Sequence, residues 1–184
     1  LVKITDAYPM TEADISLITT ASSLHDIGKI RIPEEILNKP GRLTDEEFRI
    51  MKTHSELGAD MIQDMHFPKD NSLVRASWEI CRWHHERWDG KGYPDGLKGE
   101  EIPISAQVVS IVDVYDALTS ERCYKKAFDH DTAIQMILDG QCGQFNPILL
   151  KCLKELSIQL SKMSGKEMDD NKHYHEIQRL SNEI

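Results

Sequence analysis

The sequence predicts an all-α protein built as a single bundle of about six to seven helices. In several segments apolar residues recur at helical spacing, and helix-start signals precede three of them, the third being Asn146-Pro147, an N-cap with proline at the first helical position. We find no β-hairpin signal, no internal repeat and no strand-loop-helix unit with a glycine-rich phosphate loop. The 184 residues suit one domain, expected over residues 1–160. Residues 161–184 are polar and form either a peripheral helix or a partly disordered tail.

The composition indicates a soluble domain with a substantial core. Hydrophobic residues make up 40% of the chain and charged residues 29%, and the net charge is −9. A generic nucleic-acid binder usually carries a basic surface, so we expect no DNA partner. An acidic domain that handles an anionic substrate needs local positive charge, which metals and placed Lys or Arg side chains can supply.

The cysteine pattern predicts a cytoplasmic protein, and no targeting or membrane-spanning segment is visible in the sequence. No run of about 18 apolar residues is present, which predicts that no segment spans a membrane, and no signal peptide is visible. The cysteines form no CxxC pair, so buried reduced thiols are expected rather than disulfides or a zinc cluster. They are Cys81, Cys123, Cys142 and Cys152. Because the chain begins at Leu1 without a methionine, we expect it to be part of a longer protein.

The first helix is expected over residues 11–28, starting at a Thr11-x-x-Asp14 segment that resembles a capping box. Its apolar stripe continues into His25, with Asp26 at the edge of the same face. A buried His-Asp pair can be a hydrogen-bonded couple or part of a metal site. Because buried charge is costly unless it is paired or bound to a metal, the metal interpretation is favoured.

A connector over residues 32–42 separates this helix from a second one, which begins at the capping box Thr44-x-x-Glu47 and runs to about Met65. His54 lies on the edge of its apolar face. On local evidence alone, a lone histidine at such a place is more often a hydrogen-bonded core residue than a ligand.

The third helix is expected from about Leu73 to Arg87, and it carries the adjacent residues His84 and His85 near its end. A long loop rich in glycine and proline follows over residues 88–103. Neutral imidazoles are good ligands for divalent transition metals, so a metal-binding helix end beside a constrained loop is one interpretation. A helix end and surface turn with incidental histidines is the other.

Three further helices complete the bundle, over residues 104–120, 131–139 and 147–160. Asp113 stands in the apolar part of the first of these, which makes it a candidate ligand or hydrogen-bond acceptor. Arg122, Lys125 and Lys126 follow that helix, either as a solvated helix end or as a phosphate-contacting cluster.

Six candidate ligands fall at or near core-facing positions of four predicted helices. They are His25, Asp26, His54, His84, His85 and Asp113. His and Asp ligands suit Fe or Mn, and less exclusively Zn or Ni, with Mg also possible. Two metals about 3.5–4 Å apart can hold a hydroxide for in-line attack on a phosphodiester. A carboxylate such as that of Asp26 can bridge such a pair, although spacing alone does not establish this arrangement.

Three segments closely resemble the HD-GYP family. They are Leu24-His25-Asp26-Ile27-Gly28-Lys29, the stretch from His84 to Leu97 that contains Gly92-Tyr93-Pro94, and Asp113-Val114-Tyr115-Asp116-Ala117-Leu118-Thr119. The family comprises bacterial cyclic-di-GMP phosphodiesterases within the HD superfamily of metal-dependent phosphohydrolases. The resemblance covers roughly residues 20–150, and it implies an HD-type helical bundle with a long loop that carries the GYP motif.

The resemblance also implies roles for individual residues. The six candidates above match the family's metal ligands, with Asp26 as the bridging carboxylate, and the match of His54 overrides the local interpretation. Lys29 matches a lysine that contacts the scissile phosphate or assists proton transfer. Further substrate contacts are implied for Gly92, Tyr93, Pro94, Arg122 and Lys125.

The sequence departs from the family at two places. The family has another metal-binding His or Glu on a helix before the HD pair, whereas no histidine precedes His25 and Glu12 lies in a capping segment. We expect that helix to precede Leu1 in a longer protein. Cys123 stands where the family often has proline, which alters loop stiffness more than chemistry.

The expected function is therefore metal-dependent hydrolysis of cyclic di-GMP to linear pGpG, to GMP, or to both. Alternatives are a sensor or interaction module that binds the nucleotide without turnover, hydrolysis of a related substrate such as cyclic GMP-AMP, and oxidative chemistry at a di-iron site. Expected partners are an upstream receiver or sensor domain, a signalling protein that docks on the loop around Tyr93, and a second copy of the chain.

Overall fold

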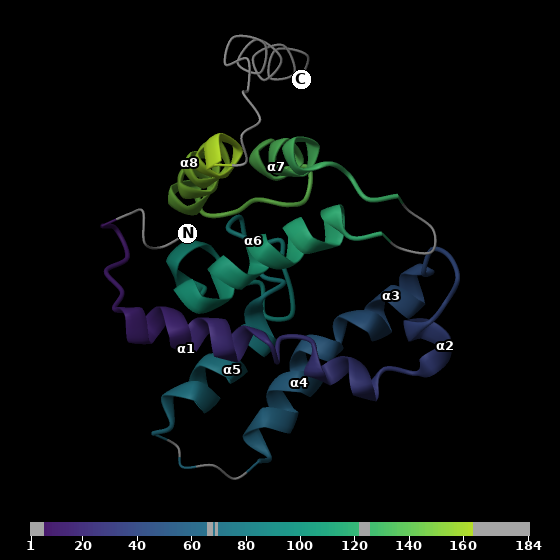
Figure 1. The fold of residues 1–184 in the computed structure, drawn as a ribbon. Coiled ribbons are helices and arrows are strands. Elements are labelled where there is room, and N and C mark those ends of the chain that lie inside the picture. The colour runs from purple at the N-terminus through teal and green to yellow at the C-terminus, as the bar shows by residue number, and fades with distance from the viewer. Residues whose placement is uncertain (1–5, 66–67, 69, 122–125, 164–184) are drawn as a thin grey trace.

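The computed structural model describes residues 6–65, 68, 70–121 and 126–163, and every regular element within them is a helix. Figure 1 shows α7 and α8 side by side at one end of the molecule, with α6 between them and the remaining helices. The all-α prediction is confirmed. In chain order the elements are α1 Glu12–Ser22, η2 Ile27–Arg31, α2 Glu34–Leu37, α3 Asp45–Lys52, α4 His54–Gln63, α5 Ser72–Trp83, η3 Gly99–Glu101, α6 Ile104–Thr119, α7 His130–Leu138 and α8 Pro147–Met163.

The core lies on both sides of α6. On one side, Ile111 and Leu118 of α6 pack with apolar residues of α7 and α8, among them Ile137 and Leu149. On the other, Val109 packs with buried residues of α1 and α5. Burial of each large aliphatic side chain contributes about 1.5–3 kcal/mol, so these contacts fix α6 at the centre of the bundle. The candidate ligand Asp113 is therefore carried by the central helix of the bundle.

Helix starts follow the predicted caps. Thr11 and Asp14 form a capping box at α1, with aspartate in the place usually taken by Glu or Gln. Thr44 and Glu47 form the same arrangement at α3. Before α8, the Asn146 side chain accepts a hydrogen bond from the Ile148 N–H, so this helix also begins where the sequence indicates.

Helix ends differ from the prediction. The expected helix over 11–28 ends at Ser22, and the chain continues through a turn into the tighter 3-10 helix η2. The expected helix over 44–65 is divided at Thr53 into α3 and α4. The expected helix over 73–87 ends at Trp83, so His84 is its C-terminal cap and His85 lies in the following turn.

A close backbone contact explains the change of geometry after α1. Gly28 of η2 lies directly against α4, where a Cβ atom on Gly28 would stand 1.9 Å from the His54 carbonyl oxygen and 2.5 Å from the Gly58 nitrogen. A regular helix with side chains could not approach α4 so closely. This contact brings the turn that contains His25 and Asp26 to the N-terminal end of α4.

The C-terminal helix α8 continues to Met163, slightly beyond the predicted end. The remaining polar residues, 164–184, lie outside the described part of the chain, so the tail over 161–184 stays a prediction. None of the helices in the described residues is both long and apolar enough to cross a membrane.

Candidate metal centre

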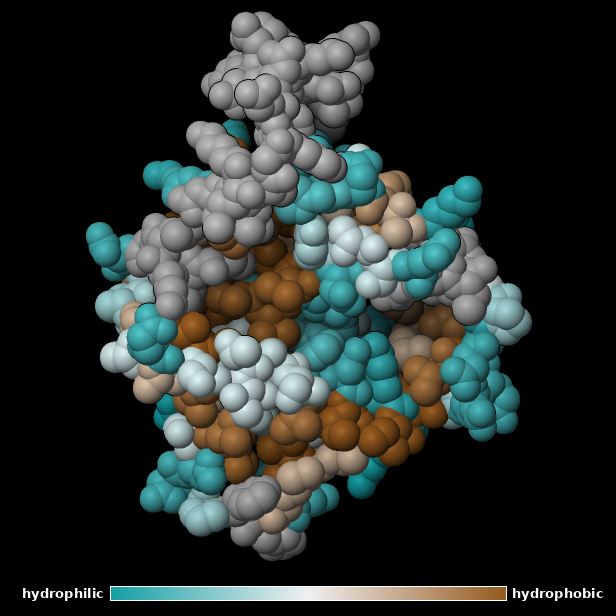
Figure 2. All heavy atoms as spheres, viewed as in Figure 1, coloured by the Kyte–Doolittle hydropathy of each residue, from teal (hydrophilic) through white to brown (hydrophobic). Residues whose placement is uncertain are grey.

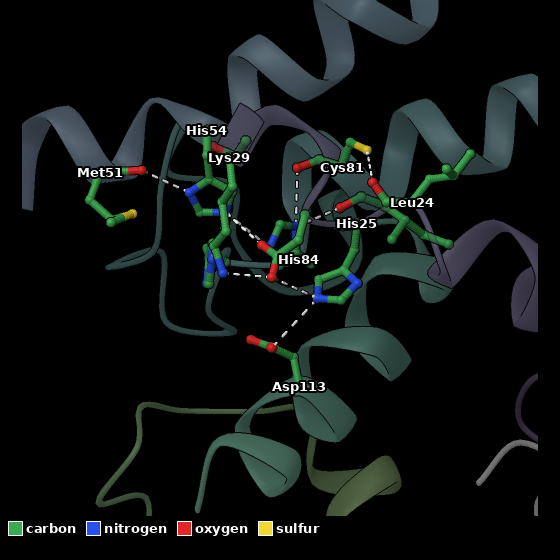
Figure 3. Close-up of polar contacts among 12 residues, drawn as sticks. Leu24, His25, Lys29, Met51, His54, Cys81, His84 and Asp113 are labelled. Atoms are coloured by element: carbon green, nitrogen blue, oxygen red, sulfur yellow. Dashed lines mark hydrogen bonds and ion pairs between the residues drawn. The ribbon is translucent and has the colours of Figure 1, made fainter. Parts of the chain in front are cut away.

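The structure brings all six predicted ligands together from four parts of the chain. The turn after α1 supplies His25 and Asp26, and the other ligands come from the start of α4, the end of α5 and the middle of α6. Figure 3 shows His25, His54, His84 and Lys29 pointing toward a common centre, with Asp113 approaching from α6. In Figure 2 the face of the molecule that is turned to the viewer has a hydrophilic recess bordered by hydrophobic surface.

The two oxygens of Asp26 face different sets of ligands. Oδ1 lies 3.3 Å from Nε2 of His54 and 4.0 Å from Nε2 of His84. Oδ2 lies 3.3 Å from Nε2 of His25 and accepts a hydrogen bond from Lys29 Nζ at 2.6 Å. The buried Oδ1 atom has no hydrogen-bond partner among the described residues. An ionised oxygen buried among imidazole nitrogens fits a cation, and a carboxylate between two ligand sets fits a bridge between two cations.

The histidine orientations are fixed by backbone carbonyls. Nδ1 of His25 donates to the Ser22 carbonyl at 2.8 Å, and Nδ1 of His54 donates to the Met51 carbonyl at 2.8 Å. Nδ1 of His84 lies 2.9 Å from the Ile80 carbonyl. In its neutral form, with the proton on Nδ1, each ring presents the Nε2 lone pair to the centre, which is the usual arrangement of metal-binding histidines. His54 and His84 then direct lone pairs at each other across 3.4 Å, a repulsive contact that a shared cation would relieve.

A third imidazole, that of His85, completes the first ligand set. The candidate ligand atoms of His54, His84 and His85 all lie within 4.8 Å of one another. Nε2 of His85 is 3.2 Å from Nε2 of His54. The second set is looser, since Nε2 of His25 is 3.7 Å from Oδ1 of Asp113. The arrangement could hold a divalent metal at the histidine cluster and a second one between His25, Asp26 and Asp113.

The protonation states suit cation binding. Burial lowers the pKa of His84 to about 4 and also lowers the pKa values of His54 and His85, so these imidazoles are neutral donors at neutral pH. Burial alone would raise the pKa of Asp26, but His25 and Lys29 hold it well below its usual value. The carboxylates of Asp113 and Asp26 raise the pKa of His25 to about 10, and a metal binding there would displace this proton.

The GYP loop forms one wall beside the ligands. The ring of Tyr93 stacks on the ring of His85, with 4.6 Å between centroids, and the Tyr93–Pro94 peptide bond is cis. Gly92 lies so close to the start of this loop that a Cβ atom would stand 2.4 Å from the Glu86 Cα atom. Glycine is therefore required for the loop to fold back on the end of α5.

Two carboxylates, the buried one of Glu86 and the exposed one of Asp95, hold the far side of this loop. Glu86 is 2% exposed, and its Oε1 atom accepts hydrogen bonds from the N–H groups of Asp95 at 2.7 Å and Gly96 at 3.0 Å. The Asp95 carboxylate in turn accepts two hydrogen bonds from Arg82 and one from the Trp83 indole. Sequence reasoning did not single out Glu86, although its place directly after the two histidines was a usable signal.

We expect Glu86→Ala to lower the free energy of unfolding by about 2–4 kcal/mol, because it leaves two inward-facing N–H groups without an acceptor and opens a cavity. Glu86→Gln keeps an acceptor oxygen of the same shape and should cost about 1 kcal/mol or less. Urea unfolding followed by circular dichroism measures both. Equal losses in the two variants would contradict the role assigned to the Oε1 atom.

Some other residues that the sequence analysis named lie within the described part of the chain, and others lie outside it. Lys29 lies in the centre, where its ammonium donates a hydrogen bond to Asp26. Cys81 is buried nearby, where its thiol donates to the Leu24 carbonyl and burial raises its pKa to about 12. Arg122 and Lys125 lie outside the described residues, as does Cys123. Arg87 was not singled out, and its half-buried guanidinium donates to the Glu86 carbonyl and to the Ser110 hydroxyl.

Comparison with known proteins gives consistent matches. The model of the HD domain family matches residues 2–147. A cyclic di-GMP phosphodiesterase of Vibrio cholerae is 46% identical over 77% of this chain and 29% of its own length. A cyclic di-GMP phosphodiesterase of Thermotoga maritima is 38% identical over 92% of this chain and 45% of its own. A 3'3'-cGAMP-specific phosphodiesterase of Vibrio cholerae is 38% identical over 80% of this chain and 28% of its own. The chain thus spans less than half of the length of each of these relatives.

Solved structures share the fold. A protein from Bdellovibrio bacteriovorus described as an HDG"Y"P protein superposes with a TM-score of 0.61, at 24% identity, over 87% of this chain and 46% of its own. A cyclic GMP-AMP phosphodiesterase of Vibrio cholerae superposes with a TM-score of 0.58, at 19% identity, over 94% of this chain and 44% of its own. At these identities the superpositions establish the helical fold.

Proposed function

This chain belongs to the HD domain family, and on that premise we propose that it is a metal-dependent phosphodiesterase that hydrolyses cyclic di-GMP. The observation that carries the proposal is the Asp26 carboxylate, whose two oxygens face two separate ligand sets. Relatives that are cyclic di-GMP phosphodiesterases support the choice of substrate. A wholly structural ion-pair cluster would not need three neutral imidazoles around a buried oxygen without a hydrogen-bond partner.

We assign the cofactor as two divalent ions, Fe or Mn in the first place, with Zn, Ni and Mg as alternatives. One ion would be held by His54, His84, His85 and Asp26, and the other by His25, Asp26 and Asp113. When bound, such ions supply Lewis-acid charge at phosphate oxygens and lower the pKa of the attacking water.

The protein's own groups position the substrate. The Lys29 ammonium donates a hydrogen bond to Asp26 Oδ2. A phosphate bound beside that carboxylate would lie within reach of the ammonium, which would neutralise the charge that develops on the phosphate. Tyr93 and its neighbours Gly92 and Pro94 would bound the substrate on the His85 side. Arg122 and Lys125 are proposed as further phosphate contacts. We also propose a cytoplasmic location, an upstream regulatory domain, docking of a signalling partner on the Tyr93 loop, and a homodimer.

One experiment tests this function: the 184-residue chain is loaded anaerobically with Fe(II) or Mn(II), and its metal content and its turnover of cyclic di-GMP are measured together. We expect about two bound ions per chain and release of pGpG or GMP, with loss of both ions and turnover after chelation. Cyclic GMP-AMP is tested in parallel, because cGAMP-specific phosphodiesterases are among the relatives. Metal-loaded protein that binds cyclic di-GMP without hydrolysing it would overturn the enzyme proposal in favour of a sensor.

A further inference from the structure

Lys52 places a positive charge at the edge of the metal centre that the proposed mechanism does not use. It is the last residue of α3 and stands two positions before the candidate ligand His54. Its ammonium lies 5.6 Å from the ring centroid of Tyr93, the residue that stacks on His85. Within the described ranges, no carboxylate oxygen lies within 4.0 Å of this ammonium. The charge is thus held next to the centre by an aromatic ring and stays available to an anion.

Phe48 extends the same edge with an exposed aromatic ring. It lies one helical turn before Lys52, and the Lys52 ammonium is 5.4 Å from its ring centroid. The side chain is half exposed, with 50% of its surface accessible, although it is large and apolar. An exposed ring beside an anion-seeking cation has the chemistry of a nucleotide subsite, where bases stack on aromatic faces and cations meet phosphates.

We propose that Lys52 and Phe48 form a second substrate subsite, in which Lys52 contacts the phosphate that is not being cleaved and Phe48 carries a nucleobase. The inference rests on the proposed function, since a cyclic dinucleotide has two phosphodiesters and two bases on one ring. When one phosphodiester lies at the metal centre beside Lys29, the other needs its own cation. In a chain with a net charge of −9, an ammonium without a carboxylate partner at the rim meets that need.

The competing explanation is that the two residues have only a structural role. Phe48 and Lys52 are spaced four residues apart on one helix face, and such a side-chain pair stabilises a helix by about 0.2–0.5 kcal/mol. In that case Lys52 would merely hold Tyr93 in place. The two explanations differ in substrate dependence. A structural role affects every phosphodiester that the metal centre cleaves, whereas a subsite role affects only a ligand large enough to reach α3.

The test uses bis(4-nitrophenyl) phosphate as a small substrate and cyclic di-GMP as its competitor, with the metal-loaded 184-residue chain. We expect Lys52→Met, which keeps the aliphatic contact but removes the charge, to raise the inhibition constant of cyclic di-GMP roughly ten- to a hundred-fold. Phe48→Ala should raise it roughly five-fold or more. Lys52→Arg keeps the charge and should retain most of the affinity for cyclic di-GMP. Lys154→Met, an exposed replacement on α8 with the same loss of charge, should change neither the inhibition constant of cyclic di-GMP nor the turnover of the small substrate.

The outcomes separate this inference from the proposed function. Formation of pGpG or GMP by the parent chain reports on the function alone, whereas the inhibition constants report on the subsite whether or not cyclic di-GMP is cleaved. Proportional changes in turnover of the small substrate and in the inhibition constant would overturn the subsite in favour of the structural role. An inhibition constant unchanged in both Lys52→Met and Phe48→Ala, or no inhibition of the parent chain, would overturn it as well.

Discussion

Replacing Asp26 by asparagine is expected to remove at least one of two bound metal ions and to reduce phosphodiester turnover by about 10³-fold or more. The amide keeps the shape of the side chain but loses the charge and presents one oxygen instead of two. His54 and His84 lie near one carboxylate oxygen, and His25 and Lys29 lie near the other, so the single amide oxygen can serve only one of these two sets. Because both ligand sets depend on this one residue, no other single ligand should have so large an effect.

Metal analysis and thermal unfolding distinguish loss of metal from loss of fold. Ligands that bind only the folded state raise its stability in proportion to the logarithm of their concentration, so added Mn(II) should raise the unfolding temperature of the parent chain. The same addition should raise the unfolding temperature of Asp26→Asn by less than it raises that of the parent chain. Asp60→Asn, an exposed replacement on α4, should behave like the parent. An Asp26→Asn variant that retained two ions and full turnover would refute the bridging role.

The starts of the helices could be predicted because their signals are local. The capping box of Thr44 and Glu47 uses only atoms within one turn, and the Asn146-Pro147 pair fixes its helix start in the same way. The ends of the helices could not be predicted, because they depend on contacts between distant segments. The 3-10 turn after α1 exists because Gly28 meets α4, and no pattern within residues 11–28 describes that contact.

The role of His54 likewise depends partly on local sequence and partly on contacts between distant segments. His54 is 1% exposed, as a core histidine would be, and its Nδ1 proton is satisfied by a carbonyl, so the local interpretation describes half of its environment correctly. Only the fold shows that its other nitrogen faces Asp26, from a segment far away in sequence. Lys52 illustrates the same limit, since nothing near it in sequence indicates the ring of Tyr93.

Replacing Gly28 by alanine is expected to lower the free energy of unfolding by about 3 kcal/mol or more, because the new methyl group would collide with backbone that cannot turn away. A Cβ atom there would stand 1.9 Å from the His54 carbonyl oxygen and 2.5 Å from the Gly58 nitrogen. Relief of the clash requires η2 and α4 to separate. Separation would move Asp26 away from His54, so metal affinity should fall together with stability.

The partner glycine in this contact provides a graded comparison. A Cβ atom on Gly58 would stand 3.1 Å from the Gly28 nitrogen, a tight contact that a small shift can relieve. Because alanine favours a helix interior over glycine by about 1 kcal/mol, Gly58→Ala should remain within about 1 kcal/mol of the parent chain. Urea unfolding and manganese titration of both variants measure the difference. If Gly28→Ala unfolded like Gly58→Ala and bound metal normally, the Gly28 contact would not be what positions Asp26 against His54.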